Sequence, residues 1–388
     1  MANIEDYIKW RGDLSFLNDS FNEVDSLILT QLCYLHLDGI VPPWNEKRSI
    51  SMPKLIESYW LKNSPAEIEK KLGIEQKPAK LLGLLKKSRR FSELHFANYV
   101  NLVDKEKQEQ FSAMTVWIPD GTIYVAYSGT DNTIVGWREN FNMTYMDQVP
   151  AQKEAANYLE RIYEWSNFKI RMGGHSKGGN LAVYAAIHAN NEITDKIIAI
   201  DNFDGPGFRQ KVAKHPDYIR TMEKVRTYLP ETAIVGRFLE HTEVYSVVKS
   251  DAKGAWQHDA FSWQVEGNSF LFKKKLDAES NMVETTVNLW LDKMSNEERA
   301  QFVDTLFHLL EQAQIETVND FSSMKLRDIF ELLKLMTDLD EKRRKDLRRV
   351  LRILWKEAAD VIGKEMGLPE KPEPISLPIF GKKKEEEA

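Results

Sequence analysis

Residues 174–178 read Gly174-His175-Ser176-Lys177-Gly178, and they are the most informative five residues of the chain. Residues 168–172, directly before it, are typical of a β-strand, and residues 180–187, after it, are apolar and alanine-rich like a buried helix. A serine between such a strand and helix lies on a sharp, strained turn that exposes its hydroxyl. Glycines flank it because a Cβ there would collide with the neighbouring strand and helix. We therefore expect a nucleophile elbow at Ser176 rather than an ordinary structural turn.

A hairpin and a series of separated strands surround this turn. Two β-rich runs at 111–118 and 123–127 are joined by Pro119-Asp120-Gly121-Thr122, a hairpin turn signal. A helix is expected at about 152–165, before the strand that leads into the elbow. Further strands are expected at 196–203, 224–229 and 244–248. Because strands alternate with helices, we predict an α/β fold for residues 108–273, with a mostly parallel, doubly wound sheet and flanking helices.

The regions before and after this core differ from it in pattern. Residues 1–107 are expected to be mainly helical and to pack on the core. Residues 274–366 are expected to form an all-helical C-terminal region, in which Ser295-Asn296-Glu297-Glu298 is a capping box. Residues 367–388 are rich in proline and then in charged residues, so we expect a disordered tail there.

The composition restricts the classes of protein to consider. The chain has 388 residues, 42% of them hydrophobic, and a formal net charge of -6, so we expect a buried core and no nucleic-acid partner. Cys33 is the single cysteine, which excludes an intrachain disulfide and a cysteine-based metal site. The first residues lack the pattern of a secretory signal, and no stretch approaches the roughly 18 to 20 apolar residues of a membrane helix. These features predict a cytoplasmic location.

The last long helix of the C-terminal region begins with a basic run. Its basic residues are Lys342, Arg343, Arg344, Lys345, Arg348, Arg349 and Arg352. Acidic residues surround them, so a solvated helix face is the favoured interpretation. Peripheral contact with an anionic membrane, or contact with nucleic acid, is the alternative.

A serine hydroxyl needs a histidine to accept its proton, and that histidine needs a carboxylate to orient it. His188 lies on the helix after the elbow, from which it cannot reach back to the serine. His215 lies in a polar connection, and His241 ends a helical stretch. His258 lies in a loop after the last expected strand, close to several aromatic residues. We therefore predict His258 as the base.

The acid is expected among the carboxylates that follow the later strands. Asp204 stands at the carboxyl end of a strand, in a tight turn with Gly205-Pro206-Gly207. Glu231 follows the next strand and Asp251 follows the last one, whereas Asp201 precedes Asp204 by three residues. We rank Asp204 first, then Glu231, then Asp251.

An oxyanion hole needs two donors aimed at the developing negative charge. One is expected to be the backbone N–H of Lys177, the residue after the nucleophile. The second is expected from Thr130, in the loop Tyr127-Ser128-Gly129-Thr130-Asp131 after an early strand. An ordinary polar turn is the alternative interpretation of that loop.

Short motifs along residues 124–263 point to a family. They include Tyr124-Val125-Ala126-Tyr127-Ser128-Gly129-Thr130, then Trp137, and Gly174-His175-Ser176-Lys177-Gly178-Gly179-Asn180. Together they resemble the class 3, fungal-type lipase superfamily. Three further strings resemble a poorly characterised bacterial, lipase-like branch of that superfamily. They are Phe203-Asp204-Gly205-Pro206-Gly207-Phe208, Gln257-His258-Asp259 and the opening Trp10-Arg11-Gly12-Asp13-Leu14. The resemblance implies an oxyanion loop at Gly129-Thr130 and an acyl-ester or lipid substrate.

Two positions depart from the pattern of that superfamily. Lys177 stands where lipases usually have an apolar residue, which places a cation beside the nucleophile. Lipases of this class carry their acid in a D-x-V-P string, and the matching stretch here, Ala233-Ile234-Val235-Gly236, has no aspartate. Asp204 therefore ranks first, and Glu231 stays an alternative nearby.

These features predict a serine hydrolase of the α/β-hydrolase fold that cleaves a carboxylic ester without a metal or organic cofactor. Trp137, Phe141 and Tyr145 are candidates for an acyl pocket, with buried packing as the alternative. Two other classes of function stay open. One is a non-catalytic hydrolase scaffold whose helical C-terminus binds a partner, and the other is a membrane-surface binding protein that uses the basic helix.

Overall fold

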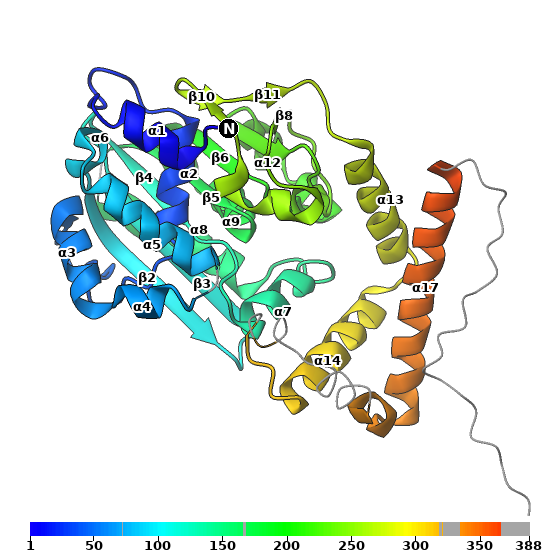
Figure 1. The fold of residues 1–388 in the computed structure, drawn as a ribbon. Coiled ribbons are helices and arrows are strands. Elements are labelled where there is room, and N and C mark those ends of the chain that lie inside the picture. The colour runs from blue at the N-terminus through cyan, green and yellow to red at the C-terminus, as the bar shows by residue number, and fades with distance from the viewer. Residues whose placement is uncertain (72, 166–167, 318–319, 321–333, 366–388) are drawn as a thin grey trace, which may run out of the picture.

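The centre of the molecule is a nine-stranded sheet with helices on both faces (Figure 1). The computed structural model describes residues 1–71, 73–165, 168–317, 320 and 334–365. The strands follow the spatial order β1-β2-β3-β4-β5-β6-β7-β8-β11. They are β1 (Ile50–Ser51), β2 (His95–Asp104), β3 (Glu109–Trp117), β4 (Thr122–Tyr127), β5 (Lys169–His175), β6 (Ile197–Phe203), β7 (Val225–Pro230), β8 (Tyr245–Val248) and β11 (Phe272–Lys273). The fold is α/β, as predicted.

The sheet is mixed, which corrects the prediction of a mostly parallel one. The strands from β4 to β8 are parallel neighbours, whereas those from β1 to β4 are antiparallel and β11 runs antiparallel to β8. With the separate ribbon of β9 (Val265–Glu266) and β10 (Ser269–Phe270), antiparallel pairings slightly outnumber parallel ones among the described strands. The reason lies in the connections: short turns join β2 to β3 and β3 to β4, and a short turn joins antiparallel neighbours only.

β2 extends the sheet into the region expected to be mainly helical. It pairs with β3 along most of its length, so residues 1–107 and 108–273 share one sheet. The pairing register shifts between Ala97 and Val100, and Asn98 within this bulge has a φ of 56°. The sheet therefore crosses the expected boundary at residue 107.

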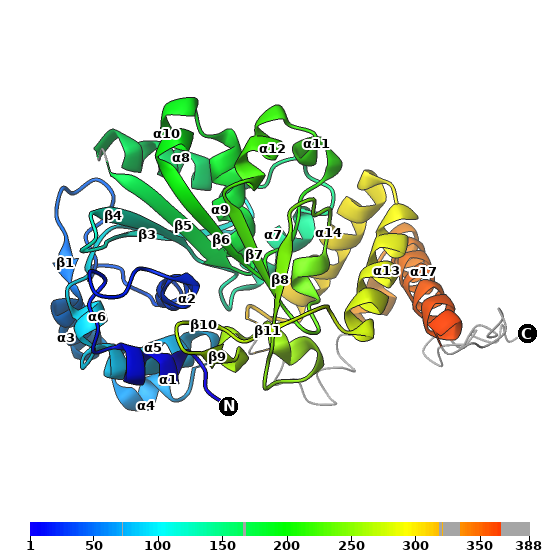
Figure 2. The ribbon, with the colours of Figure 1, turned by 90° about the horizontal axis from the view of Figure 1, so that it is seen from above.

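Helices cover both faces of the sheet (Figure 2). One face carries α8 (Pro150–Trp165), α9 (Lys177–His188), α10 (Asn191–Lys196) and α12 (Pro216–Met222), and the other carries α1 (Ile4–Arg11), α2 (Glu23–Leu32) and α5 (Gly73–Leu85). Further α-helices of this part of the chain are α3 (Met52–Lys62), α4 (Pro65–Ile68), α6 (Arg89–Ser92), α7 (Ile134–Asn142) and α11 (Gln210–Ala213). Nine of the ten residues of α2 are buried, so it is a core helix beneath the sheet. Separate apolar clusters fill the space on each side of the sheet.

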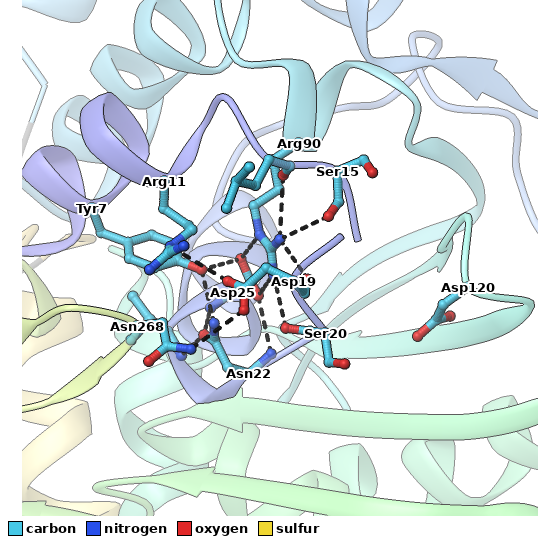
Figure 3. Close-up of polar contacts among 12 residues, drawn as sticks. Tyr7, Arg11, Ser15, Asp19, Ser20, Asn22, Asp25, Arg90, Asp120 and Asn268 are labelled. Carbon is cyan, nitrogen blue, oxygen red and sulfur yellow. Dashed lines mark hydrogen bonds and ion pairs between the residues drawn. The ribbon is translucent and has the colours of Figure 1, made fainter. Parts of the chain in front are cut away.

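A buried ion pair holds the N-terminal helices together (Figure 3). The guanidinium of Arg90 donates to both carboxylate oxygens of Asp25, at 2.8 and 2.6 Å, and neither side chain is exposed. It also donates to the backbone carbonyls of Asp19 and Ser20, at 2.8 and 3.0 Å. The hydroxyl of Tyr7 donates to Asp25 at 2.9 Å. These contacts join α1, α2 and α6 to the loop at 14–20.

The C-terminal helices form a group of their own beside the sheet (Figure 1). They are α13 (Ala278–Asp292), α14 (Asn296–Gln312) and α17 (Glu341–Glu365), and the capping box at Ser295 is confirmed at the start of α14. α14 packs on α7 through the rings of Phe141 and Phe307, whose centroids lie 5.8 Å apart. The expected tail at 367–388 lies outside the described residues. Of the described helices, none is long and apolar enough to cross a membrane.

Candidate active site

Ser176 lies on the turn between β5 and α9, as the elbow prediction requires. Its backbone has φ 59° and ψ −132°, a conformation that costs a non-glycine residue free energy. The flanking glycines are needed for space. A Cβ on Gly174 would lie 2.1 Å from the carbonyl carbon of Gly178, and a Cβ on Gly178 would lie 2.2 Å from the carbonyl oxygen of Tyr127. The strand, the helix and the next strand therefore approach closely enough to hold Ser176 in the strained turn.

His258 and Asp204 lie against each other at the same edge of the sheet. His258 ends a short 3₁₀ helix (Gly254–His258) after β8, and Asp204 directly follows β6. The Nδ1 atom of His258 lies 2.6 Å from Oδ2 of Asp204. Asp204 is fully buried, and its other carboxylate oxygen accepts the Gly236 N–H at 3.0 Å. Both oxygens of the carboxylate are therefore engaged, which fixes its orientation toward the imidazole.

The loop that carries His258 is held by its neighbours. The side chain of Gln257 accepts the N–H of Thr232 at 2.7 Å, and the indole N–H of Trp263 donates to the Gln257 carbonyl at 2.9 Å. Trp263 is fully buried, and Asp259 pairs with Lys77 on α5. The imidazole therefore projects from an anchored loop.

His175, the residue before the serine, is a site residue that the sequence interpretation missed. Its Nε2 lies 2.8 Å from the backbone carbonyl of His258, and its Nδ1 lies 2.9 Å from the hydroxyl of Tyr34. The two imidazole rings are 4.7 Å apart between centroids. Burial, with a smaller effect of His258, lowers the pKa of His175 to about 3. The signal available in the sequence was the histidine within the elbow motif itself.

Thr130 lies in the loop between β4 and α7, as predicted. Its side-chain oxygen accepts a hydrogen bond from the amide of Asn140 on α7 at 2.7 Å. The hydroxyl keeps its own proton, so it can still donate to a ligand. Lys177 is the first residue of α9, and the first N–H groups of a helix have no partner within the helix. Asn140 was not anticipated, because nothing in the sequence indicates which side chain of α7 faces the loop.

The side chain of Lys177 is buried and fully occupied. Its ammonium donates to the carbonyl and the side-chain oxygen of Gln110, both at 2.6 Å, and to Glu139 at 2.8 Å. Glu139 also accepts the N–H groups of Gln110 and Ala151, at 3.2 and 2.8 Å. The cation expected beside the nucleophile is thus neutralised by Glu139, and the network joins α9 to α7, α8 and β3.

The other histidines that were considered have partners elsewhere. His188 hydrogen-bonds the carbonyl of Tyr184 at 3.0 Å, and His241 lies 2.9 Å from Glu243. His215 lies near Asp217. The rings of His188 and His215 also lie against each other, with centroids 5.5 Å apart. These contacts of the three histidines do not include Ser176 or Asp204.

The alternative acids also bind other partners. Glu231 pairs with Lys273 at 3.2 Å, and Asp251 pairs with the N-terminal amine at 3.2 Å. Asp201 receives a bidentate pair from Arg226 at 2.7 and 2.8 Å. Of the four carboxylates considered, Asp204 is the one that contacts His258.

The candidate acyl-pocket residues divide between packing and solvent. Phe141 and Tyr145 pack against apolar residues of α14, whereas Trp137 is 43% exposed. Within the described part of the chain, no cluster of three or more histidine, cysteine, aspartate or glutamate residues is arranged to hold a metal ion.

Comparison with known protein families gives a match over the central part of the chain. A family model described as Mbeg1-like matches residues 85–308, more than half of the chain. The matched range contains the elbow, Asp204, His258, Thr130 and Glu139. A search of curated proteins found no match.

Proposed function

The chain belongs to the Mbeg1-like family, which is lipase-like, and on that premise we propose that it is a serine hydrolase of the α/β-hydrolase fold that cleaves carboxylic esters. The observation that carries the proposal is the 2.6 Å contact between His258 and the buried Asp204, at the sheet edge where the strained Ser176 lies. The parallel part of the sheet supports the fold. The serine follows β5, the carboxylate follows β6 and the histidine follows β8, which is the chain order of that fold.

The proposed reaction begins with attack of Ser176 Oγ on the acyl carbon. Nε2 of His258 accepts the serine proton and then passes it to the departing alcohol oxygen. Asp204 holds the Nδ1 proton and stabilises the imidazolium that forms. Water then attacks the acyl-enzyme with His258 as base, which releases the acid and restores the serine proton.

The oxyanion of each tetrahedral intermediate is assigned to Thr130 and to the N–H of Lys177. The amide of Asn140 orients the Thr130 hydroxyl, and the N-terminal end of α9 adds a favourable dipole. From the motif resemblance we also propose that the protein is a member of the class 3 lipase superfamily and that its substrate is an acyl ester or a lipid. A cytoplasmic location is proposed as well.

Hydrolysis of p-nitrophenyl esters with short to long acyl chains tests the proposal. S176A and H258N are expected to lower kcat by about 10⁴-fold or more, because the nucleophile or its base is lost. H241N and D251N are matched controls that remove a histidine and a carboxylate outside the site, and both should keep wild-type turnover. A folded wild-type protein without turnover on any ester would favour the non-catalytic scaffold.

One observation favours an additional role in membrane contact. Five exposed basic residues of α17 recur at spacings of three and four, which places them on one helix face: Lys342, Lys345, Arg349, Arg352 and Lys356. Trp355 beside them is 59% exposed. Four of the five form no ion pair with any residue that the structure describes, Arg349 being paired with Glu298. We propose that this face contacts anionic lipid, with the tryptophan at the interface.

Vesicle cosedimentation tests this second role. Wild type is expected to bind phosphatidylcholine vesicles that contain phosphatidylserine more tightly than vesicles of phosphatidylcholine alone, and the binding should weaken as salt rises. K345E/R352E should abolish the difference. K86E/K87E, the same charge change on an exposed pair elsewhere, should retain it. Equal binding by all three proteins would reject the role.

A further inference from the structure

His175 connects three parts of the site. It is the residue before Ser176, and its two ring nitrogens reach the carbonyl of His258 and the hydroxyl of Tyr34. Tyr34 follows α2 in the N-terminal region, and its partner lies 141 positions further along the chain. The Mbeg1-like match, which begins at residue 85, does not include Tyr34. The proposed mechanism gives neither side chain a task.

The partners fix the tautomer of His175. A backbone carbonyl can only accept, so Nε2 of His175 must carry a proton and donate it to His258. Because burial lowers the pKa of His175, the ring is neutral near pH 7 and Nδ1 keeps its lone pair. Burial also raises the pKa of the Tyr34 phenol, so its hydroxyl stays protonated and can donate to Nδ1. The chain of donation runs from Tyr34 through His175 to the main chain of His258.

Tyr34 also occupies the space beside the oxyanion loop. A Cβ on Gly129 would lie 2.0 Å from the Tyr34 hydroxyl oxygen and 2.6 Å from the His175 carbonyl. The Tyr34 hydroxyl and the His175 carbonyl together therefore require a glycine in the Ser128-Gly129-Thr130 string. The Tyr34 side chain thus packs on the oxyanion loop and also hydrogen-bonds to His175, the residue before the nucleophile.

We propose that Tyr34 and His175 are positioning residues for the hydrolase reaction, which set the place of the His258 imidazole relative to Ser176 and to the oxyanion loop. This inference rests on the proposed function. The neutral His175 ring lies beside the His258 ring at a tilt of 30°, so it supports an imidazolium there without adding a second positive charge. A displacement of about 1 Å in such a group lowers turnover by about 10²-fold.

Two substitutions separate positioning from general packing. H175F keeps an aromatic ring near His258 but removes the donor to its carbonyl, so we expect kcat to fall by about 10- to 100-fold with little change in KM. H175Q restores an N–H donor near the Nε2 position, and it should recover most of the loss. H188F is the matched control, because His188 also lies against an aromatic ring and hydrogen-bonds a backbone carbonyl, but outside the site. It should leave kcat at the wild-type value.

A readout without substrate keeps this inference separate from the proposed function. The proton that His258 Nδ1 shares with Asp204 should give a downfield ¹H resonance in ¹⁵N-histidine spectra, identified by its loss in H258N. We expect the resonance to shift or broaden in H175F and to persist in H175Q and H188F. If wild type proves inactive on every ester, the hydrolase proposal fails, and this resonance alone decides whether the pair orients His258.

Three outcomes would overturn the inference. One is a folded H175F that keeps both the wild-type kcat and the resonance. Another is an equal loss of kcat in H175F and H175Q together with an equal fall in Tm, which would make His175 a packing residue only. The third is a resonance that H175Q loses as completely as H175F does.

Discussion

Two carboxylates of this protein, Asp25 and Asp204, are equally buried and have different partners. Asp25 is held by the permanently charged guanidinium of Arg90 and by a tyrosine hydroxyl. Asp204 is held by an imidazole and by one backbone N–H. An arginine cannot release a proton near neutral pH, so the first pair can only hold the N-terminal helices together. A histidine can accept and release one, so the second pair can do chemistry.

The largest expected effect is on turnover and comes from D204N. Asparagine keeps an oxygen for the Gly236 N–H but presents an NH₂ group to His258, which forces the imidazole proton onto Nε2. That nitrogen then cannot accept the serine proton, so kcat should fall by about 10⁴-fold. D251N is the control, measured in the same ester assay. Turnover near wild type in D204N would show that Asp204 is not the acid.

R90M should have the opposite effect to D204N. It should strongly lower the stability of the protein and leave the turnover of each folded molecule unchanged. It leaves the Asp25 carboxylate buried without its cation, which should lower the free energy of unfolding by about 3–5 kcal/mol. Urea unfolding measures this, with R89M as the exposed neighbour for comparison. If R90M lowers the free energy of unfolding no more than R89M does, the buried Asp25–Arg90 pair does not hold the N-terminal helices together.

The pH dependence of stability should reveal the buried neutral imidazole of His175. Its folded pKa of about 3 lies below the unfolded value of about 6.5, so the unfolded state binds the extra proton. The contribution of His175 to stability is complete above about pH 6.5 and is lost as pH falls toward 3. Between pH 7 and pH 4, wild type should lose about 3 kcal/mol more than H175Q does. Parallel pH curves for the two proteins would contradict a neutral, buried His175.

The smallest expected effects come from two glycines. In G236A the new Cβ would lie 2.3 Å from Oδ1 of Asp204, so the carboxylate must shift and kcat should fall by about 10- to 100-fold. G83A adds a methyl group in open space within α5, and it should stabilise the protein by about 0.5–1 kcal/mol without changing kcat. We therefore expect a lower kcat in G236A and an unchanged kcat in G83A. Equal turnover in both variants would mean that the orientation of Asp204 does not matter.

The local arrangement of the candidate site was largely predictable from sequence. The elbow at Ser176 lies between a strand and a helix because glycines, β-prone residues and an alanine-rich run each favour their own conformation over a few positions. His258 and Asp204 were selected as residues that follow strands, and parallel strands end at the same sheet edge.

Long-range partners and strand register were not predictable in the same way. Asn98 in a bulge interrupts the alternation of β2, so that strand was placed within a helical region. The contact of Tyr34 with His175 depends on the packing of α2 beneath the sheet, which no local pattern encodes. The direction of the Lys177 side chain is set by Gln110 and Glu139 from two other elements.

The most direct test of the central claim is covalent labelling by a fluorophosphonate probe, followed by mass spectrometry of the labelled peptide. The account predicts one phosphonylated residue, Ser176, in wild type, with no label in S176A and slow labelling in H258N and D204N. Labelling of another serine, or a rate in H258N equal to that of wild type, would contradict it.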